Sequence, residues 1–203
     1  SGNSEILQCI FGAKQAVSGR IKIQGKEIKS FEPATSIKNS LAFLPADRKN
    51  LGLVLGMTIK RNISLTGLDQ LSNFFVVKNH QENAVVDQLI KKLRIKSRSR
   101  EQMVETLSGG NQQKVVMAKW LLPECQILMF DEPTRGIDVG ARSEIYELML
   151  EYVDQGGTIV MVSSDMQELL AVCDRIIVIG QGQVTAVFDH EEATEEKIGM
   201  AMF

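Results

Sequence analysis

The sequence predicts an α/β fold with a mostly parallel sheet covered by helices. Three short runs in its second half are apolar throughout, and a helical segment separates each from the next: QILMF (126–130), TIVMV (158–162) and RIIVI (175–179). Strands that are apolar on both faces are typical of a parallel sheet with helices on each side. At 203 residues and 44% hydrophobic content, the chain is large enough to bury a core of this kind.

The elements before these runs follow from local patterns. Residues 4–11 favour a helix, and SGRIKIQGKEI (18–28) predicts two short strands around a Gln-Gly turn. Residues 33–39 then predict a short helix, and LAFLP (41–45) predicts a short buried strand.

Further helices are expected beside the three apolar runs, over residues 110–122, 141–153 and 166–173. The closing segment GQGQVTAVFDH (180–190) predicts a hairpin at the edge of the sheet.

The middle of the chain is the exception to this alternation of strands and helices. Between residues 57 and 105 the alternation is lost, while apolar residues recur at three- and four-residue steps, at Val85, Val86, Leu89, Ile90 and Leu93. This spacing predicts an amphipathic helix over residues 80–93. We therefore expect one domain over residues 1–203, with a mostly helical subdomain inserted at about 57–108.

The same segment holds KKLRIKSRSR (91–100), in which six of ten residues are basic. The plain interpretation of this run is a solvated helix end followed by a loop. Binding to acidic lipid headgroups or to an acidic partner is the alternative.

Composition and charge exclude several classes of protein. The chain has 23 Lys and Arg against 25 Asp and Glu, which argues against a dedicated nucleic-acid binder with a basic face. No window approaches 18 uninterrupted apolar residues, and SGNSEILQCI lacks the basic start of a secretory signal. Three cysteines and two histidines form neither a disulfide framework nor a zinc pattern, and they suit a reducing cytosol.

Two acidic residues, Asp131 and Glu132, come directly after the apolar run QILMF. Ligands of an open parallel sheet lie at the carboxyl ends of its strands. One carboxylate there can hold Mg²⁺, and its neighbour can polarise a water for in-line attack on a phosphorus atom. The alternative is that Asp131 merely caps the following helix.

A second motif, LSGGNQQ (107–113), leads into the helix expected over 110–122. Ser108 is a good N-cap, and Gly109 and Gly110 let backbone N–H groups approach a ligand closely. A helix N-terminus attracts phosphate through its unpaired N–H groups and its dipole. The alternative is a capped helix in which the glycine pair is incidental.

Together these motifs resemble those of ABC (ATP-binding cassette) modules. LSGGNQQKVVMAKWL is similar to the ABC signature, ILMFDEP to the Walker B strand, and TRGIDVGAR (134–142) to the D-loop. The resemblance implies a P-loop NTPase fold with a mostly parallel sheet and an inserted helical subdomain. It also implies ATP and Mg²⁺ as cofactors, Glu132 as the catalytic residue and Asp131 as a metal ligand. The implied ATP contacts in these motifs are Ser108, Gly109, Gly110, Gln112 and Asp138.

Longer strings narrow the resemblance. LPADRKNLGLVLGMTIKRNISL (44–65) and DEPTRGIDVGA (131–141) are similar to the second ABC module of the two-module ATPases of bacterial sugar importers, of the ribose, galactose and xylose type. This implies ATP-driven import of a small sugar, at the cytoplasmic face of the inner membrane. The implied partners are a second ABC module, membrane-spanning permease subunits and, indirectly, a periplasmic sugar-binding protein, with no nucleic acid.

The Walker A loop departs from the family pattern G-x-x-x-x-G-K-[S/T]. Only its tail is expected here, as Gly2, Asn3 and Ser4, because Gly19 then falls at the family's usual sixteen residues after the lysine position. Asn3 thus takes the place of the phosphate-binding lysine, and Ser4 supplies the hydroxyl that faces Mg²⁺. The strands that normally precede this loop are expected to be missing from the chain.

Two further positions depart from the family. Ser164, in VSSDM, stands where most ABC modules have a switch histidine, and Ala46 stands at the Q-loop position. Losing one charge-assisted contact to phosphate typically costs roughly 1.5–3 kcal/mol. We therefore expect the chain's own ATP site, lined by Gly2, Asn3, Ser4 and Ser164, to be degenerate. The complete signature would still close the ATP site of a partner module.

Two other functions stay open at this point. A nucleotide-binding regulatory module without hydrolysis is compatible with the same substitutions. A chromosome-maintenance or repair ATPase head shares the fold, but such heads are divided by long coiled coils, and the sequence has no sustained heptads.

Overall fold

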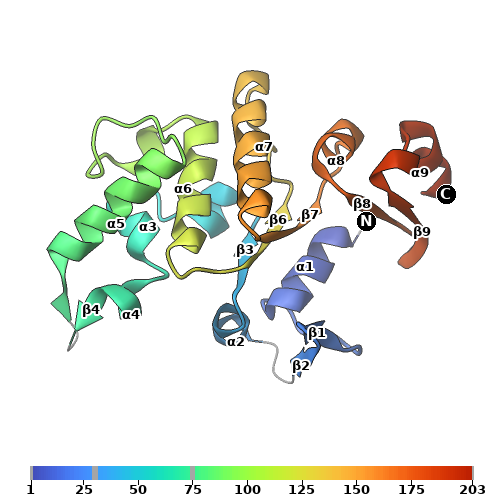
Figure 1. Cartoon of the computed structure of the whole chain (residues 1–203), viewed down its shortest axis with the longest axis horizontal. Helices are drawn as coiled ribbons and strands as arrows, with labels where there is room; N and C mark the ends of the chain where they lie inside the picture. Colours follow the sequence, from blue (N-terminus) through green and yellow to red (C-terminus); the bar gives the residue numbers. More distant parts are fainter. Residues whose placement is uncertain (1, 29–31, 74–75, 203) are drawn as a thin grey trace.

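A three-stranded parallel sheet lies at the centre of the molecule (Figure 1). The computed structural model describes residues 2–28, 32–73 and 76–202. The sheet consists of β3 (Leu41–Leu44), β6 (Ile127–Asp131) and β7 (Thr158–Val162), in the order β3-β6-β7. Both pairings are parallel, so the three strands end at the same edge of the sheet. The predicted parallel sheet is therefore confirmed.

β6 is the most deeply buried of these strands, and Leu128 and Phe130 are both 0% exposed. The strand is covered because β3 and β7 pair with its two edges and helices pack on its faces. In Figure 1, α7 (Val139–Asp154) lies above the sheet and α1 (Asn3–Phe11) below it. Phe11 at the end of α1 packs against Phe43 of β3, with the ring centroids 5.6 Å apart.

The expectation that the other two apolar runs are buried on both faces is wrong. In β7, Ile159 is partly buried while Val160 is 42% exposed. β8 (Arg175–Gly180) alternates between buried and exposed side chains, and it pairs with β9 (Gln183–Asp189) in the expected hairpin. Among the described residues this hairpin is a separate two-stranded sheet, so the expectations that residues 175–179 join the parallel sheet and that the hairpin lies at its edge are wrong. In the described part of the chain, one face of each strand is open to solvent. Apolar composition alone does not distinguish such strands from fully covered ones.

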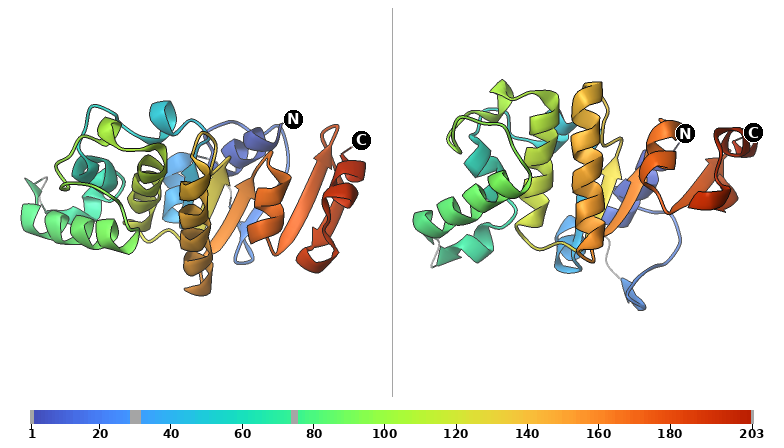
Figure 2. Two further views of the ribbon diagram at one scale, coloured as in Figure 1. Left: turned by 90° about the horizontal axis from the view of Figure 1, so that it is seen from above. Right: turned by 45° about the horizontal axis from the view of Figure 1, so that its top comes forward.

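The predicted helices are present with boundaries within two residues of those expected. Besides α1 and α7 they are α2 (Pro33–Lys38), α5 (Asn79–Lys92), α6 (Gly109–Leu121) and α8 (Met166–Val172). The expected first hairpin consists of β1 (Ile21–Ile23) and β2 (Lys26–Ile28). A C-terminal helix, α9 (Glu195–Ala201), and the turn η3 (His190–Glu192) were not expected. Ile198 of α9 packs with Ile176 and Val178 of β8 in a small second core. Figure 2 shows α9, in dark red at the C-terminal end, beside the hairpin of β8 and β9.

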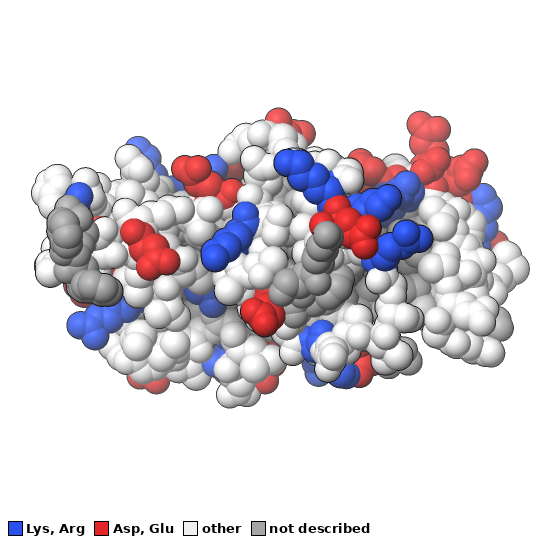
Figure 3. Space-filling view, turned by 90° about the horizontal axis from the view of Figure 1, so that it is seen from below, with Lys and Arg blue, Asp and Glu red and all other residues white. Residues whose placement is uncertain are grey.

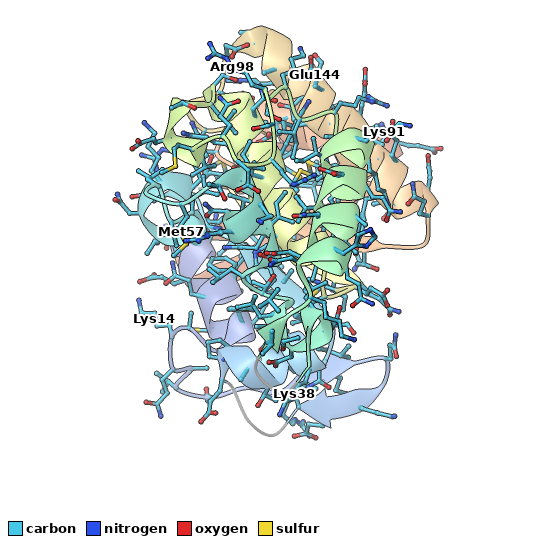
Figure 4. All side chains as sticks on the ribbon, turned by 90° about the vertical axis from the view of Figure 1, so that its left-hand side faces the viewer. Lys14, Lys38, Met57, Lys91, Arg98 and Glu144 are labelled. Atoms are coloured by element: carbon cyan, nitrogen blue, oxygen red, sulfur yellow. The ribbon has the colours of Figure 1, made fainter. Side chains whose placement is uncertain are left out.

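Helices of different lengths form the end of the molecule that lies at the left of Figure 1 and faces the viewer in Figure 4. They are α3 (Ile59–Ser64), α4 (Leu68–Leu71), α5 and the turn η2 (Val104–Thr106), with α6 packed against α3 and α5. These elements lie within residues 57–108, where we expect a helical subdomain. A small pair of strands, β4 (Ser72–Asn73) with β5 (Val76–Val77), was not expected, because two-residue strands have no detectable periodicity.

Ion pairs join this helical end to α7. Lys114 of α6 is 1% exposed, and its Nζ lies 2.6 Å from a carboxylate oxygen of Glu144, which is labelled in Figure 4. Lys96 pairs with the other oxygen at 2.9 Å, and Arg94 pairs with Glu147 at 2.9 Å. Hydrogen bonds from Lys114 and Lys96 lower the pKa of Glu144 to about 2. Arg94 and Lys96, which belong to the basic run 91–100, therefore form ion pairs within the chain.

On the face seen from below, acidic and basic side chains are interspersed (Figure 3). The helices in the described ranges are all too short or too polar to cross a membrane.

A second buried lysine, Lys119 of α6, donates a hydrogen bond of 2.6 Å to the carbonyl oxygen of Gly52. Gly52 ends the π-helical turn η1 (Arg48–Gly52), so this contact ties η1 to α6. Burial lowers the pKa of Lys119 from 10.5 to about 8, because the ammonium loses its hydration.

The pKa of Lys119 predicts a pH dependence of stability. From pH 8 to 10.5 the folded chain has released this proton while the unfolded chain still binds it, so the free energy of unfolding rises with pH. The cost of burying the cation is therefore present in full below pH 8 and relieved, by up to about 3 kcal/mol, near pH 10.5. Urea unfolding of the wild type and Lys119→Met across this range should show the wild type gaining stability relative to the variant. Lys91→Met, exposed on α5, is the control, and a difference between wild type and Lys119→Met that stays constant with pH would contradict the prediction.

Candidate functional site

Ser4 and Asp131, which are 127 residues apart in sequence, meet at the carboxyl edge of the sheet. The Ser4 hydroxyl donates to Asp131 Oδ1 at 2.6 Å. Asp131 is the last residue of β6 and is 4% exposed, and Ser4 lies in the first turn of α1. Asp131 does not cap the following helix, because the N-cap of α7 is Asp138, whose carboxylate accepts from the Ala141 N–H at 3.0 Å.

The hydrogen bond between Ser4 and Asp131 lies at the N-terminus of α1. Gly2 is the N-cap, with a left-handed φ of 116° that a residue with a side chain rarely adopts, and Asn3 is the first helical residue. Unpaired N–H groups and the helix dipole make such a terminus suitable for phosphate. The structure therefore brings Gly2, Asn3, Ser4 and Asp131 to one place.

Glu132 continues from β6 onto the same edge and contacts Ser164 across the neighbouring strand. The Ser164 N–H donates to Glu132 Oε1 at 2.9 Å, and its hydroxyl donates to Oε2 at 3.1 Å. Glu132 has a left-handed φ of 52°, and its N–H donates to the carbonyl oxygen of Val162 at 2.8 Å. Both carboxylate oxygens are therefore held by the residue that stands at the expected switch position.

A buried glutamate behind this pair was not anticipated from the sequence. Glu168 of α8 is 2% exposed and accepts from the Thr134 hydroxyl at 2.8 Å and from the Ser163 hydroxyl. It thereby connects the loop that follows Glu132 to the residue that precedes Ser164. In the sequence, Glu168 is one charged residue in MQELLAV, and nothing there distinguishes it from a solvated position.

The motif LSGGNQQ forms the start of α6, with Ser108 as N-cap. Its hydroxyl accepts from the Asn111 amide at 2.9 Å. Neither glycine leaves space for a side chain: a Cβ at Gly110 would lie 2.8 Å from the Ala141 Cβ, and one at Gly109 would lie 2.6 Å from Arg48 Nη2. The glycine pair is therefore required by packing as well as by any ligand.

The expected ATP contact of Gln112 does not fit this arrangement. Its side chain is 3% exposed, and its amide nitrogen donates inward to the carbonyl oxygen of Val104 at 3.2 Å. The partly exposed amide next to Ser108 is that of Asn111. Gln112 lies one helical position further on, on the inner face of α6, which explains why the spacing in sequence was misleading.

The predicted site residues fall into two groups in the structure, which we call half-sites. One consists of Gly2, Asn3, Ser4, Asp131 and Glu132, and the other of the residues 108–110 at the start of α6. No hydrogen bond among the described residues joins the two.

The first half-site suits Mg²⁺ with phosphate. The Ser4 hydroxyl and the Asp131 carboxylate are oxygen donors, which hard cations prefer. Within the described ranges, no three His, Cys, Asp or Glu side chains form a metal cluster by themselves. Phosphate oxygens and water would therefore have to complete the coordination of a cation here.

Comparison with known proteins decides the family. The sequence profile of the ABC transporter family matches residues 1–135. The chain belongs to the ABC transporter family. It is 46% identical over 198 residues to the ribose import ATP-binding protein RbsA of Chromobacterium violaceum, covering 98% of this chain and 39% of that protein. The xylose import ATP-binding protein XylG of Thermoanaerobacter pseudethanolicus is 45% identical over 199 residues, with the same coverage of 98% and 39%. The chain thus spans about two fifths of the length of these curated relatives.

Solved ABC cassettes share the fold. The cassette MJ1267 of an ABC transporter superimposes with a TM-score of 0.82 at 20% identity, covering 100% of this chain and 83% of that chain. The dimeric cassette MJ0796 bound to ADP and Pi gives a TM-score of 0.77 at 21% identity, covering 93% and 81%. These likenesses confirm the α/β ABC fold that the motifs predicted.

In this ABC module, Glu168 should be needed for stability of the loops after Walker B. Glu168→Gln keeps the shape but removes the charge, so both hydrogen bonds become neutral and one hydroxyl group must reorient to accept from the amide. We expect a loss of about 1–3 kcal/mol in the free energy of unfolding, measured by urea titration of the chain. The matched control is Glu196→Gln, the same change at an exposed position. Equal stability of the two variants would disprove the role of the buried hydrogen bonds.

Proposed function

We propose that the chain is an ATP-binding module that powers carbohydrate import through an ABC transporter. The observation that carries the proposal is the meeting of Ser4 and Asp131 at the N-terminus of α1, which forms the phosphate and Mg²⁺ side of a nucleotide site. The relatives named above are ribose and xylose import ATP-binding proteins, and they match nearly the whole chain.

The proposed partners are a second ABC module, in the same polypeptide or as a dimer mate, and membrane-spanning permease subunits. A periplasmic sugar-binding protein would act with them indirectly. The module would lie peripherally at the cytoplasmic face of the inner membrane. Support comes from the import function named for the relatives, of which this chain spans 39%.

In the chain's own half-site, the first-turn N–H groups of α1 would bind the phosphates of ATP. The Ser4 hydroxyl and Asp131 would hold Mg²⁺, which when bound neutralises charge on the phosphates. Glu132 would orient the attacking water as a general base. Asn3 would supply an uncharged donor in place of the usual lysine.

We further propose that this half-site is degenerate. Ser164 donates one hydrogen bond to each carboxylate oxygen of Glu132, so fewer of its acceptor positions remain free to orient a water. Asn3 provides no positive charge for the phosphates. Both features lower the rate that this half-site can support, although the carboxylates themselves are in place.

The signature at residues 108–110 would instead serve the ATP bound to the partner module. Ser108 would supply its hydroxyl, and Gly109 and Gly110 their N–H groups, to the γ-phosphate. These groups lie at the start of α6, where the helix dipole also favours a negative charge. The module would therefore support turnover at a site whose Walker motifs belong to its partner.

A regulatory module that binds nucleotide without any turnover is the second candidate. The double hydrogen bond between Ser164 and Glu132 favours it, because it leaves the general base engaged. The two candidates differ in whether the signature of this chain is needed for hydrolysis by the partner.

Substitutions in the two half-sites test this difference in the complete two-module protein. Ser108→Arg should reduce steady-state ATP hydrolysis by about 100-fold or more, because it blocks transition-state contacts at the partner's site. Glu132→Gln should have a much smaller effect, because the chain's own half-site contributes little. Ser99→Arg, at an exposed loop position, controls for the added charge. A loss of turnover in Glu132→Gln comparable to that in Ser108→Arg would disprove the asymmetry.

Restoring the missing charge tests the nucleotide site directly. Asn3→Lys should tighten ATP binding to the chain by about 10- to 100-fold, since a charge-assisted hydrogen bond to phosphate replaces a neutral one. The measurement is titration calorimetry with ATP and Mg²⁺. Gln8→Lys adds the same charge further along α1 and should leave the affinity nearly unchanged. Equal affinities of the two variants would show that Asn3 does not face the phosphates.

A further inference from the structure

One side chain, that of Arg48, connects the segment after β3 to the D-loop turn. Arg48 begins η1, two residues beyond Ala46. Its Nη1 donates to the carbonyl oxygen of Arg135 at 2.7 Å, and its Nη2 donates to that of Gly136 at 3.1 Å. The guanidinium thus holds two successive carbonyl groups with two separate nitrogens, and the left-handed φ of 65° at Gly136 shapes the turn that presents them.

The same guanidinium lies against the signature. A Cβ placed on Gly109 would lie 2.6 Å from Arg48 Nη2 and 3.1 Å from the carbonyl oxygen of Gly136. Gly109, Arg48 and Gly136 are therefore packed together with no space for even a methyl group. One planar group thus binds the D-loop turn and packs against the start of α6.

The surroundings of Arg48 disfavour the charged form of its guanidinium group. Desolvation lowers the pKa of Arg48, and among the described residues its buried Nε has no hydrogen-bond partner. A cavity of about 310 Å³ opens beside the group, lined by Ala46, Asp47, Lys49, Arg135 and Gly136. A lysine at this position could turn its ammonium group into the cavity, whereas the planar guanidinium group of arginine binds the carbonyl groups of Arg135 and Gly136 at the same time.

We propose that Arg48 is a positioning residue for the signature: it fixes Gly109 relative to the D-loop turn at Gly136. This inference rests on the proposed function, in which residues 108–110 contact the γ-phosphate bound to a partner module. Arg48 does not touch that phosphate itself. It sets the placement of the backbone that does, and misplacement of such a group by about 1 Å can cost roughly 100-fold in rate.

The contact itself is tested in the chain alone, by a double-mutant cycle on thermal stability. Gly109→Ala should lower the Tm, because its methyl group meets the guanidinium. In the Arg48→Met background the same change should cost less, because the flexible apolar side chain can move away. Costs of Gly109→Ala that are equal in the two backgrounds would overturn the contact. This outcome does not depend on whether the module supports hydrolysis.

The positioning role is tested in the complete two-module protein, for folded variants checked by circular dichroism. Arg48→Met and Arg48→Lys should each lower kcat for ATP hydrolysis by roughly 10- to 100-fold while KM for ATP stays close to that of the wild type. Lys49→Met lines the same cavity and should leave kcat unchanged. Recovery of kcat in Arg48→Lys, or an equal loss in Lys49→Met, would overturn the proposal. A wild-type protein without ATPase activity would instead refute the proposed function, and the cycle on Gly109 would still decide the contact.

Discussion

The burial of β6 is the constraint on which the rest of the site depends. β3 and β7 pair with its two edges in register, and its side chains are packed from both faces, so the strand cannot shift. Asp131 and Glu132 are therefore delivered to a fixed point at the sheet edge. α1 packs below the same sheet, and its first turn places Ser4 within 2.6 Å of Asp131. The position of both carboxylates follows from core packing, before any ligand is present.

Loops rather than strands carry the remaining functional groups, and polar side chains from neighbouring elements hold these loops. Glu168 binds the hydroxyl groups of Thr134 and Ser163, which flank the Glu132–Ser164 pair. Arg48 binds the carbonyl oxygens of the turn at Gly136 and packs against Gly109. Glu168 is buried and Arg48 is partly buried, and each binds polar groups of segments that flank the site. The loop geometry is thereby tied to the same core that fixes β6.

The sequence was sufficient to predict the central parallel sheet, the boundaries of α1, α2 and α5–α8, and the motifs, because these depend on local patterns of apolar residues, glycine and caps. It did not predict that β7 and β8 each leave one face exposed, since an apolar run does not reveal what covers it. It also placed Gln112 at the ligand, whereas the helical twist of α6 turns this residue inward. Glu168 and Arg48 were missed because their partners are distant in sequence.

The serine at position 164 has a consequence for proton chemistry. An imidazole titrates near neutral pH, so a histidine at this position would change its charge over the range in which cells operate. The backbone N–H and hydroxyl of Ser164 that bind Glu132 carry no such charge. The donor side of this contact therefore keeps the same charge across the pH range in which an imidazole would gain or lose a proton.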